Sequence, residues 1–268
     1  MRALAPTLLA ASLGLACVLG YRGAVEIEAV YPLEDVDAVR LRLPDSPLSV
    51  LGDPVGEALV VSGAWYSVGG SQASAAANAE AGRLEFARDG RFAELAVIIP
   101  ITSRDVVDLE LDEVTIPADR DLEIWNGVGD VEVAQVEGNI SIDLDAGHVS
   151  VFGGAEGIGI RTGAGDLEIV TTGNTEAHTG RGDVELVQEG AGGNDLIVTT
   201  ESGSIDAVLR SDANLDLAIV AGGDIRIQTR TVSTVTSGRF NREVGNGNVK
   251  IWLKAPRGNV TIRLDESL

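Results

Sequence analysis

Apolar and polar residues alternate in short runs along most of the chain, and the longest series of runs extends from Asp121 to about Val208. Alternation with a period of two is typical of a strand with one buried face. A glycine and a small polar residue precede each run, so each phrase predicts a turn followed by a short strand. The phrases are Gly129-Asp130-Val131-Glu132-Val133, Gly138-Asn139-Ile140-Ser141-Ile142, Gly147-His148-Val149-Ser150-Val151, Gly165-Asp166-Leu167-Glu168-Ile169, Gly182-Asp183-Val184-Glu185-Leu186 and Gly203-Ser204-Ile205-Asp206-Ala207. The pattern predicts an all-β protein.

The phrases recur at a nearly constant spacing. Gly129, Gly147 and Gly165 are 18 residues apart, and two strands fit in each interval. A short fixed period is typical of solenoids and other stacked arrays. We therefore predict a single-chain parallel β-solenoid, similar to a β-helix, with coils of about 18 residues. An antiparallel β-sandwich or barrel is the alternative, because a meander of hairpins also alternates in this way.

The repeat also predicts which side chains form the core. In stacked coils, equivalent positions lie one strand spacing apart, about 4.8 Å, so inward residues form ladders. The two expected ladders are Val131, Val149, Leu167, Val184, Ile205 and Val133, Val151, Ile169, Leu186, Ala207. Aromatic residues make up only 4% of the chain and glycines number 33, as suits a thin core with tight corners.

Residues 1–20 have the features of a secretory signal. Arg2 supplies a positive start, and the apolar stretch from Leu8 to Leu19 is too short to span a bilayer comfortably. Cys17, the only cysteine, follows Leu13-Gly14-Leu15-Ala16, which resembles a lipobox and predicts lipidation of Cys17. The alternative is an ordinary signal cleaved near Gly20. Both interpretations predict export to the periplasm or outer envelope, with membrane contact only through an N-terminal lipid.

The rest of the chain divides by composition. Residues 21–36 are expected to be a short lead-in, and residues 37–264 the β-solenoid domain. A stretch rich in Ser, Gly, Ala, Gln and Asn predicts a polar insertion loop at about residues 67–82. Arg230 to Val244 is a second polar excursion.

The order of the phrases resembles a known family. It begins with Val114-Thr115-Ile116-Pro117 and continues through LEIWNGVGDVEV, GNISI, GHVSV, GAGDLEIVTTG and GRGDVEL. This order resembles the bacterial exported proteins called "putative adhesins", a domain-of-unknown-function group with Gly-Asp-Val repeats, over roughly residues 37–264. The resemblance implies a β-solenoid in the cell envelope. It brings no catalytic residues and no ligand.

Charge and residue types argue against several function classes. The formal net charge of −21 disfavours binding to nucleic acid. Between Asp105 and Asp224, 26 acidic residues stand against four basic ones, a surface that would repel a polyuronic substrate. The two histidines, His148 and His178, have no nucleophile or metal-ligand spacing around them. We predict a protein that is not an enzyme and has no cofactor.

One cation site is a candidate. Asp130, Asp166 and Asp183 share one slot of the repeat, and Glu168 and Glu185 share the next outward slot. Two carboxylates about 4.8 Å apart repel by about 0.9 kcal/mol in water, and calcium, which takes oxygen ligands, would relieve this. The alternative is that each aspartate side chain bonds turn amides.

The function predicted is a non-enzymatic envelope module with an adhesive or structural role. The alternative is an envelope module that binds a cation or a glycan; Trp252, expected to point outward, could stack on a sugar. Residues from Arg226 to Ile262 are basic while the middle is acidic, which suggests head-to-tail association of copies; the alternative is that the basic coils pair with acidic loops of the same molecule. The expected partners are therefore a cell-surface glycan, an envelope protein or a second copy.

Overall fold

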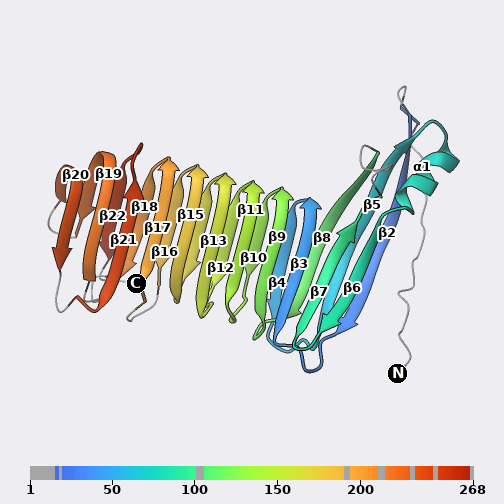
Figure 1. The fold of residues 1–268 in the computed structure, drawn as a ribbon, viewed down its shortest axis with the longest axis horizontal. Coiled ribbons are helices and arrows are strands. Elements are labelled where there is room, and N and C mark those ends of the chain that lie inside the picture. The colour runs from blue at the N-terminus through green and yellow to red at the C-terminus, as the bar shows by residue number, and fades with distance from the viewer. Residues whose placement is uncertain are drawn as a thin grey trace.

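The computed structural model describes residues 16–17, 20–100, 106–189, 194–210, 215–229, 233–243 and 247–265. These residues form strands along nearly their whole length and one helix, α1 (Gln72–Ala79) (Figure 1). The strands are β1 (Ala16–Cys17), β2 (Gly20–Pro32), β3 (Ala38–Asp45), β4 (Leu48–Asp53), β5 (Ala58–Gly69), β6 (Arg83–Asp89), β7 (Phe92–Ile98), β8 (Val107–Pro117), β9 (Asp121–Val128), β10 (Val131–Ala134), β11 (Ile140–Ala146), β12 (Val149–Gly153), β13 (Gly157–Ala164), β14 (Leu167–Thr171), β15 (Asn174–Arg181), β16 (Val184–Gln188), β17 (Leu196–Ser202), β18 (Ile205–Arg210), β19 (Leu215–Gln228), β20 (Ser233–Glu243), β21 (Val249–Ala255) and β22 (Val260–Asp265). In this part of the chain no helix is long and apolar enough to cross a membrane.

All the strands belong to one mixed sheet that folds back on itself. One layer runs β2-β5-β8-β4-β10-β12-β14-β16-β18-β22. The other runs β6-β7-β3-β9-β11-β13-β15-β17-β21. Strand β19 joins the layers, because its first half pairs with β21 and its second half with β22. At the opposite end the sheet nearly closes into a barrel-like shape, and β2 and β6 are its two edges there.

The predicted core ladders are confirmed. Val131 pairs in register with Val149, Val149 with Leu167, and the ladder continues through Val184 to Ile205. The side chains of both ladders are buried between the layers. The repeat therefore specifies which face of each strand in this region is inside.

The prediction of a parallel β-solenoid is wrong for the chain, and the barrel kept as its alternative fits. The sheet is mixed: β5 is antiparallel to both β2 and β8, and β6 with β7 and β19 with β20 are also antiparallel pairs. The physical reason is that the 18-residue repeat covers only the middle strands. Outside it, β6–β7 and β19–β20 are consecutive strands that pair antiparallel, and β5 pairs antiparallel with β2 and β8, which are not its neighbours in the sequence. The last strands also differ from the expected order, because β22 lies between β18 and β19.

Side chains and α1 close the N-terminal end. The ring of Tyr31 on β2 stacks on Phe86 of β6 with centroids 4.4 Å apart, and Arg88 donates to the Pro32 carbonyl. Burial raises the pKa of the Tyr31 phenol. Helix α1 begins with a capping box formed by Ser71 and Ser74, and it buries two alanines against β2 and β5. Residues 21–36 thus contain most of β2, and residues 67–82 contain the end of β5 and α1.

Candidate functional site

The outer face of β7, β3, β9 and β11 carries a cluster of aromatic and charged side chains. Trp125 on β9 is flanked in register by Arg42 on β3 and Asp143 on β11. Its side chain points outward because its neighbours Ile124 and Asn126 are buried. The indole is 36% exposed, and Phe92 on β7 is exposed to a similar degree. We call this cluster the Trp125 surface: Arg40, Arg42, Phe92, Glu94, Glu123, Trp125, Asp143 and Asp145.

Two arginines are held against the rings of this surface. The guanidinium of Arg42 lies 4.8 Å from the centre of the Trp125 ring. That of Arg40 lies 4.0 Å from the Phe92 ring centre and 5.9 Å from Trp125. Cation–π contacts of this kind contribute about 0.5–1 kcal/mol at exposed sites. The rings therefore help to fix both guanidinium groups.

Carboxylates on neighbouring strands fix the same arginines from the other side. The Nε atom of Arg40 lies 2.8 Å from Oε2 of Glu123, and the Nε atom of Arg42 lies 3.4 Å from Oε2 of Glu94. The Arg40 contact is also a hydrogen bond, which uses one of the five N–H donors that an arginine carries. Among the described residues, no hydrogen bond or ion pair engages the terminal nitrogens of either arginine, so their donors can serve a bound molecule.

A shallow depression of about 610 Å³ lies beside the indole. Leu43, Pro44 and Val97 contribute apolar side chains to it, and Asp143 and Asp145 contribute carboxylates. Asn126 beneath it donates from Nδ2 to the Ser46 carbonyl at 2.8 Å, which ties β9 to the corner between β3 and β4. The lining consists of Arg42, Leu43, Pro44, Val97, Trp125, Asn126, Gly127, Asp143 and Asp145.

This arrangement provides the contacts that a sugar needs. The indole offers a large apolar face, and aromatic rings combine such a face with low conformational entropy cost. Guanidinium donors and carboxylate acceptors can hydrogen-bond to hydroxyl groups. The local formal charge is two arginines against four carboxylates, a sum of −2, so the surface does not attract an anion.

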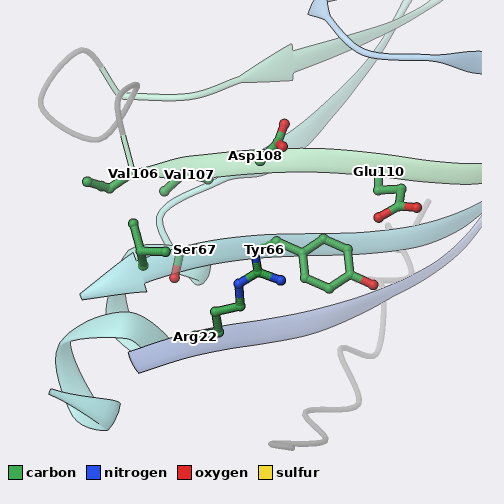
Figure 2. Close-up of a pocket in the computed structure, with 8 residues that line it drawn as sticks. Arg22, Tyr66, Ser67, Val106, Val107, Asp108 and Glu110 are labelled. Atoms are coloured by element: carbon green, nitrogen blue, oxygen red, sulfur yellow. The ribbon is translucent and has the colours of Figure 1, made fainter. Parts of the chain in front are cut away.

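A second depression of about 650 Å³ lies on the outer face of β2, β5 and β8. Figure 2 shows the guanidinium of Arg22 beside the ring of Tyr66, with Asp108 and Glu110 on the neighbouring strand β8. In the described residues no ion pair or ring contact fixes Arg22, unlike the arginines of the Trp125 surface. Each depression is lined by one aromatic ring, but among the described residues no cation–π contact holds a guanidinium over Tyr66, whereas that of Arg42 lies over Trp125. The second depression is the weaker candidate.

The aspartates of the predicted calcium site lie along one corner of the molecule. Asp130 accepts from the amide of His148 at 2.8 Å, and Asp166 accepts from the amide of Asp183 at 2.8 Å. Asp183 accepts in turn from the amide of Ser204 at 2.7 Å. Each carboxylate therefore links one repeat to the next through the backbone.

The glutamates of that site are brought together but face outward. Glu168 and Glu185 pair directly in register on β14 and β16. Among the residues that the structure describes, no three Asp, Glu, His or Cys side chains form a group suited to a metal ion. Calcium binding stays a prediction, and this geometry does not support it.

The remaining predicted positions are dispersed. Cys17 lies on β1, which pairs with the start of β2, and residues 1–15 lie outside the described part of the chain. Nδ1 of His178 lies 2.7 Å from Oγ1 of Thr199. Trp252 points outward and is 45% exposed, beside Ile197 in register, so its predicted orientation is confirmed.

Sequence reasoning missed the Trp125 surface. The signal that was present is Arg40-Leu41-Arg42 and Glu123-Ile124-Trp125, two alternating runs whose outward residues are charged or aromatic. The register of β3 with β9 decides that Arg42 meets Trp125. Since β3 and β9 are far apart in the chain, the alternation alone could not reveal that pairing.

The comparisons with known proteins add a family. The model of the Toastrack DUF4097 family matches residues 73–263, and comparison with curated proteins gives no match. A putative cell adhesion protein from Clostridium sporogenes ATCC 15579 is similar in structure, with a TM-score of 0.38, 9% identity and coverage of 90% of this chain and 99% of that one. A putative adhesin from Bacteroides fragilis NCTC 9343 has a TM-score of 0.43 and 11% identity, covering 88% and 96%. The case for function therefore rests on the side chains of this chain.

Proposed function

Starting from the fact that this chain belongs to the Toastrack DUF4097 family, a group of unknown function, we propose that it is a non-enzymatic module that binds carbohydrate. The site is the Trp125 surface. The observation that carries the proposal is the exposed indole of Trp125. The guanidinium of Arg42 lies 4.8 Å from the centre of its ring, and a depression of about 610 Å³ lies beside it. An adhesive role at the cell envelope follows if the glycan belongs to a surface.

The charges define the class of glycan. The formal sum of −2 at the Trp125 surface, within a chain of net charge −21, disfavours uronic acids and sialic acids. Neutral hexoses and N-acetylhexosamines fit better, since they combine apolar ring faces with hydroxyl and amide groups. Their binding would depend little on salt, because screening acts on charge–charge attraction.

The export predicted from residues 1–20 is consistent with this role and belongs to the same proposal. A module displayed outside the cytoplasm would meet glycans of its own envelope or of a neighbouring cell. Lipidation of Cys17 would tether it there, and a signal cleaved near Gly20 would release it.

Isothermal titration with neutral and acidic oligosaccharides tests the proposal. The intact protein should bind at least one neutral oligosaccharide, and Trp125→Ala should weaken this binding by tenfold or more, because the stacking face is removed. Trp252→Ala is the matched control, since Trp252 is also an exposed indole but lies on β21. It should change the affinity by less than about twofold, which is about 0.4 kcal/mol.

Two results would contradict the proposal. One is the absence of heat from any neutral oligosaccharide at millimolar concentration. The other is equal binding by the Trp125→Ala variant. Release of new reducing ends during the titration would instead show catalysis, and would overturn the non-enzymatic part.

A further inference from the structure

Strand β20 forms the end of the molecule opposite to β2 (Figure 1). It is antiparallel to β19 along its whole length, from Ser233 opposite Gln228 to Glu243 opposite Asp216. Every residue of β20 is exposed except Thr236 and Phe240, which are half-buried. In the described part of the chain β20 has no other strand partner. One edge of β20 therefore offers its backbone N–H and C=O groups to solvent.

This edge lacks two of the usual protections. Natural edge strands are often kept short or interrupted by proline, lysine or an inward-pointing charge. Over 11 residues, β20 has no proline and no lysine, its charges are confined to Arg239, Arg242 and Glu243, and its threonines, valine and phenylalanine favour a strand. An exposed edge of this length, free of proline, is a template for pairing with another strand.

The bend in β20 limits which strand can follow it. Strand β19 turns from one layer to the other between Ala221 and Asp224. Strand β20 follows that turn at Gly238, whose φ of +81° is favourable for glycine. A straight peptide could pair with one arm of β20 only. A second β20 has the same bend and can follow both arms.

We propose that β20 is an interface through which two copies of this chain associate, their β20 strands antiparallel about a two-fold axis at Gly238. Each arm of one strand then lies beside the opposite arm of its partner. Among the described residues, a Cβ placed on Gly238 would meet no atom within 4 Å, so a side chain there would not be crowded. Two-fold interfaces of this kind are the commonest in soluble oligomers.

The side chains are compatible with this pairing. Counting outward from Gly238, Arg239 lies opposite Ser237, Arg242 opposite Thr234 and Glu243 opposite Ser233. Like charges directly opposite each other destabilise antiparallel pairs, and this register contains none. The same register places Val235 opposite Asn241 of the partner.

The other end of the molecule does not offer the same contact. There the two sheet edges approach each other through the Tyr31–Phe86 stack, and α1 packs against β2 and β5. The pairing through β20 would also join two Trp125 surfaces in one particle. Two linked sites bind a glycan-covered surface more tightly than one, with no new contact to the sugar.

A charge-pair experiment tests the register directly. Sedimentation velocity at micromolar protein should show a mass twice that of the monomer. Val235→Lys with Asn241→Lys places lysines opposite each other across the axis, so the dissociation constant should rise by tenfold or more. Val235→Lys with Asn241→Glu places opposite charges there and should keep the dimer.

The two variants are matched in every other respect. Val235 is 55% exposed and Asn241 is exposed, so neither substitution should lower the Tm by more than about 2 °C. A monomer at 100 micromolar wild-type protein would overturn the proposal. So would equal masses for the two variants, or a mass that grows without limit, as a head-to-tail filament would give. Trp125→Ala should stay dimeric, which separates this proposal from the carbohydrate site.

Discussion

At the scale of single residues, the corner glycines carry the tightest constraint. Gly147, Gly165, Gly182 and Gly203 all have positive φ, and a Cβ built on each would overlap the carbonyl oxygen of the glycine one repeat earlier. The glycines therefore stack backbone on backbone along one corner. Beside them, aspartates such as Asp166 accept the amide of the next repeat. Together these contacts set the spacing between repeats.

Replacing Gly165 with alanine should destabilise the protein by about 2–4 kcal/mol. An alanine rarely adopts the φ of +142°, and its Cβ would overlap the carbonyl oxygen of Gly147. Gly159→Ala is the control, because the nearest atom to its Cβ is 3.8 Å away. That variant should change the free energy of unfolding by less than about 1 kcal/mol. Urea unfolding followed by circular dichroism measures both. Equal losses would show that the corner is not under the constraint described.

At the scale of single elements, alternation is the property that decides stability. On β11, Ile142 is 2% exposed in the core, while Ser141 next to it faces solvent. Ile142→Asp would bury an unpaired carboxylate and should cost more than about 4 kcal/mol. Ser141→Asp should cost less than about 1 kcal/mol. Thermal unfolding of the pair checks this, and similar Tm values would contradict the assigned faces.

Sequence reasoning worked where one element resembles the next. The repeated phrase gave the inward residues of β10, β12, β14, β16 and β18, because alternation depends only on local pattern. Sequence reasoning did not predict β20 as a strand. Its Ser/Thr-rich sequence does not alternate, because neither face of the strand is buried. The same reasoning also missed that Ser150, in an outward position, is only 9% exposed, because its register neighbours Glu132 and Glu168 flank it.

At the scale of the whole molecule, long-range pairing determines both the shape and the site. The sheet is mixed because strands at the two ends, such as β2 with β5 and β19 with β20, pair antiparallel, which an 18-residue period in the middle cannot reveal. The Trp125 surface has the same origin. Arg42, Glu94 and Trp125 come from three strands, and only the pairing of β7, β3 and β9 brings them together.

The most direct measurement of the central claim is the accessibility of Trp125 with sugar bound. In a Trp252→Phe variant the remaining indoles are Trp125 and Trp65, and Trp65 is only 3% exposed, so acrylamide quenching reports mainly on Trp125. A saturating neutral oligosaccharide should lower the quenching constant at least twofold, because the stacked sugar covers the ring. An unchanged quenching constant with the saccharide bound would place the sugar elsewhere and contradict the account.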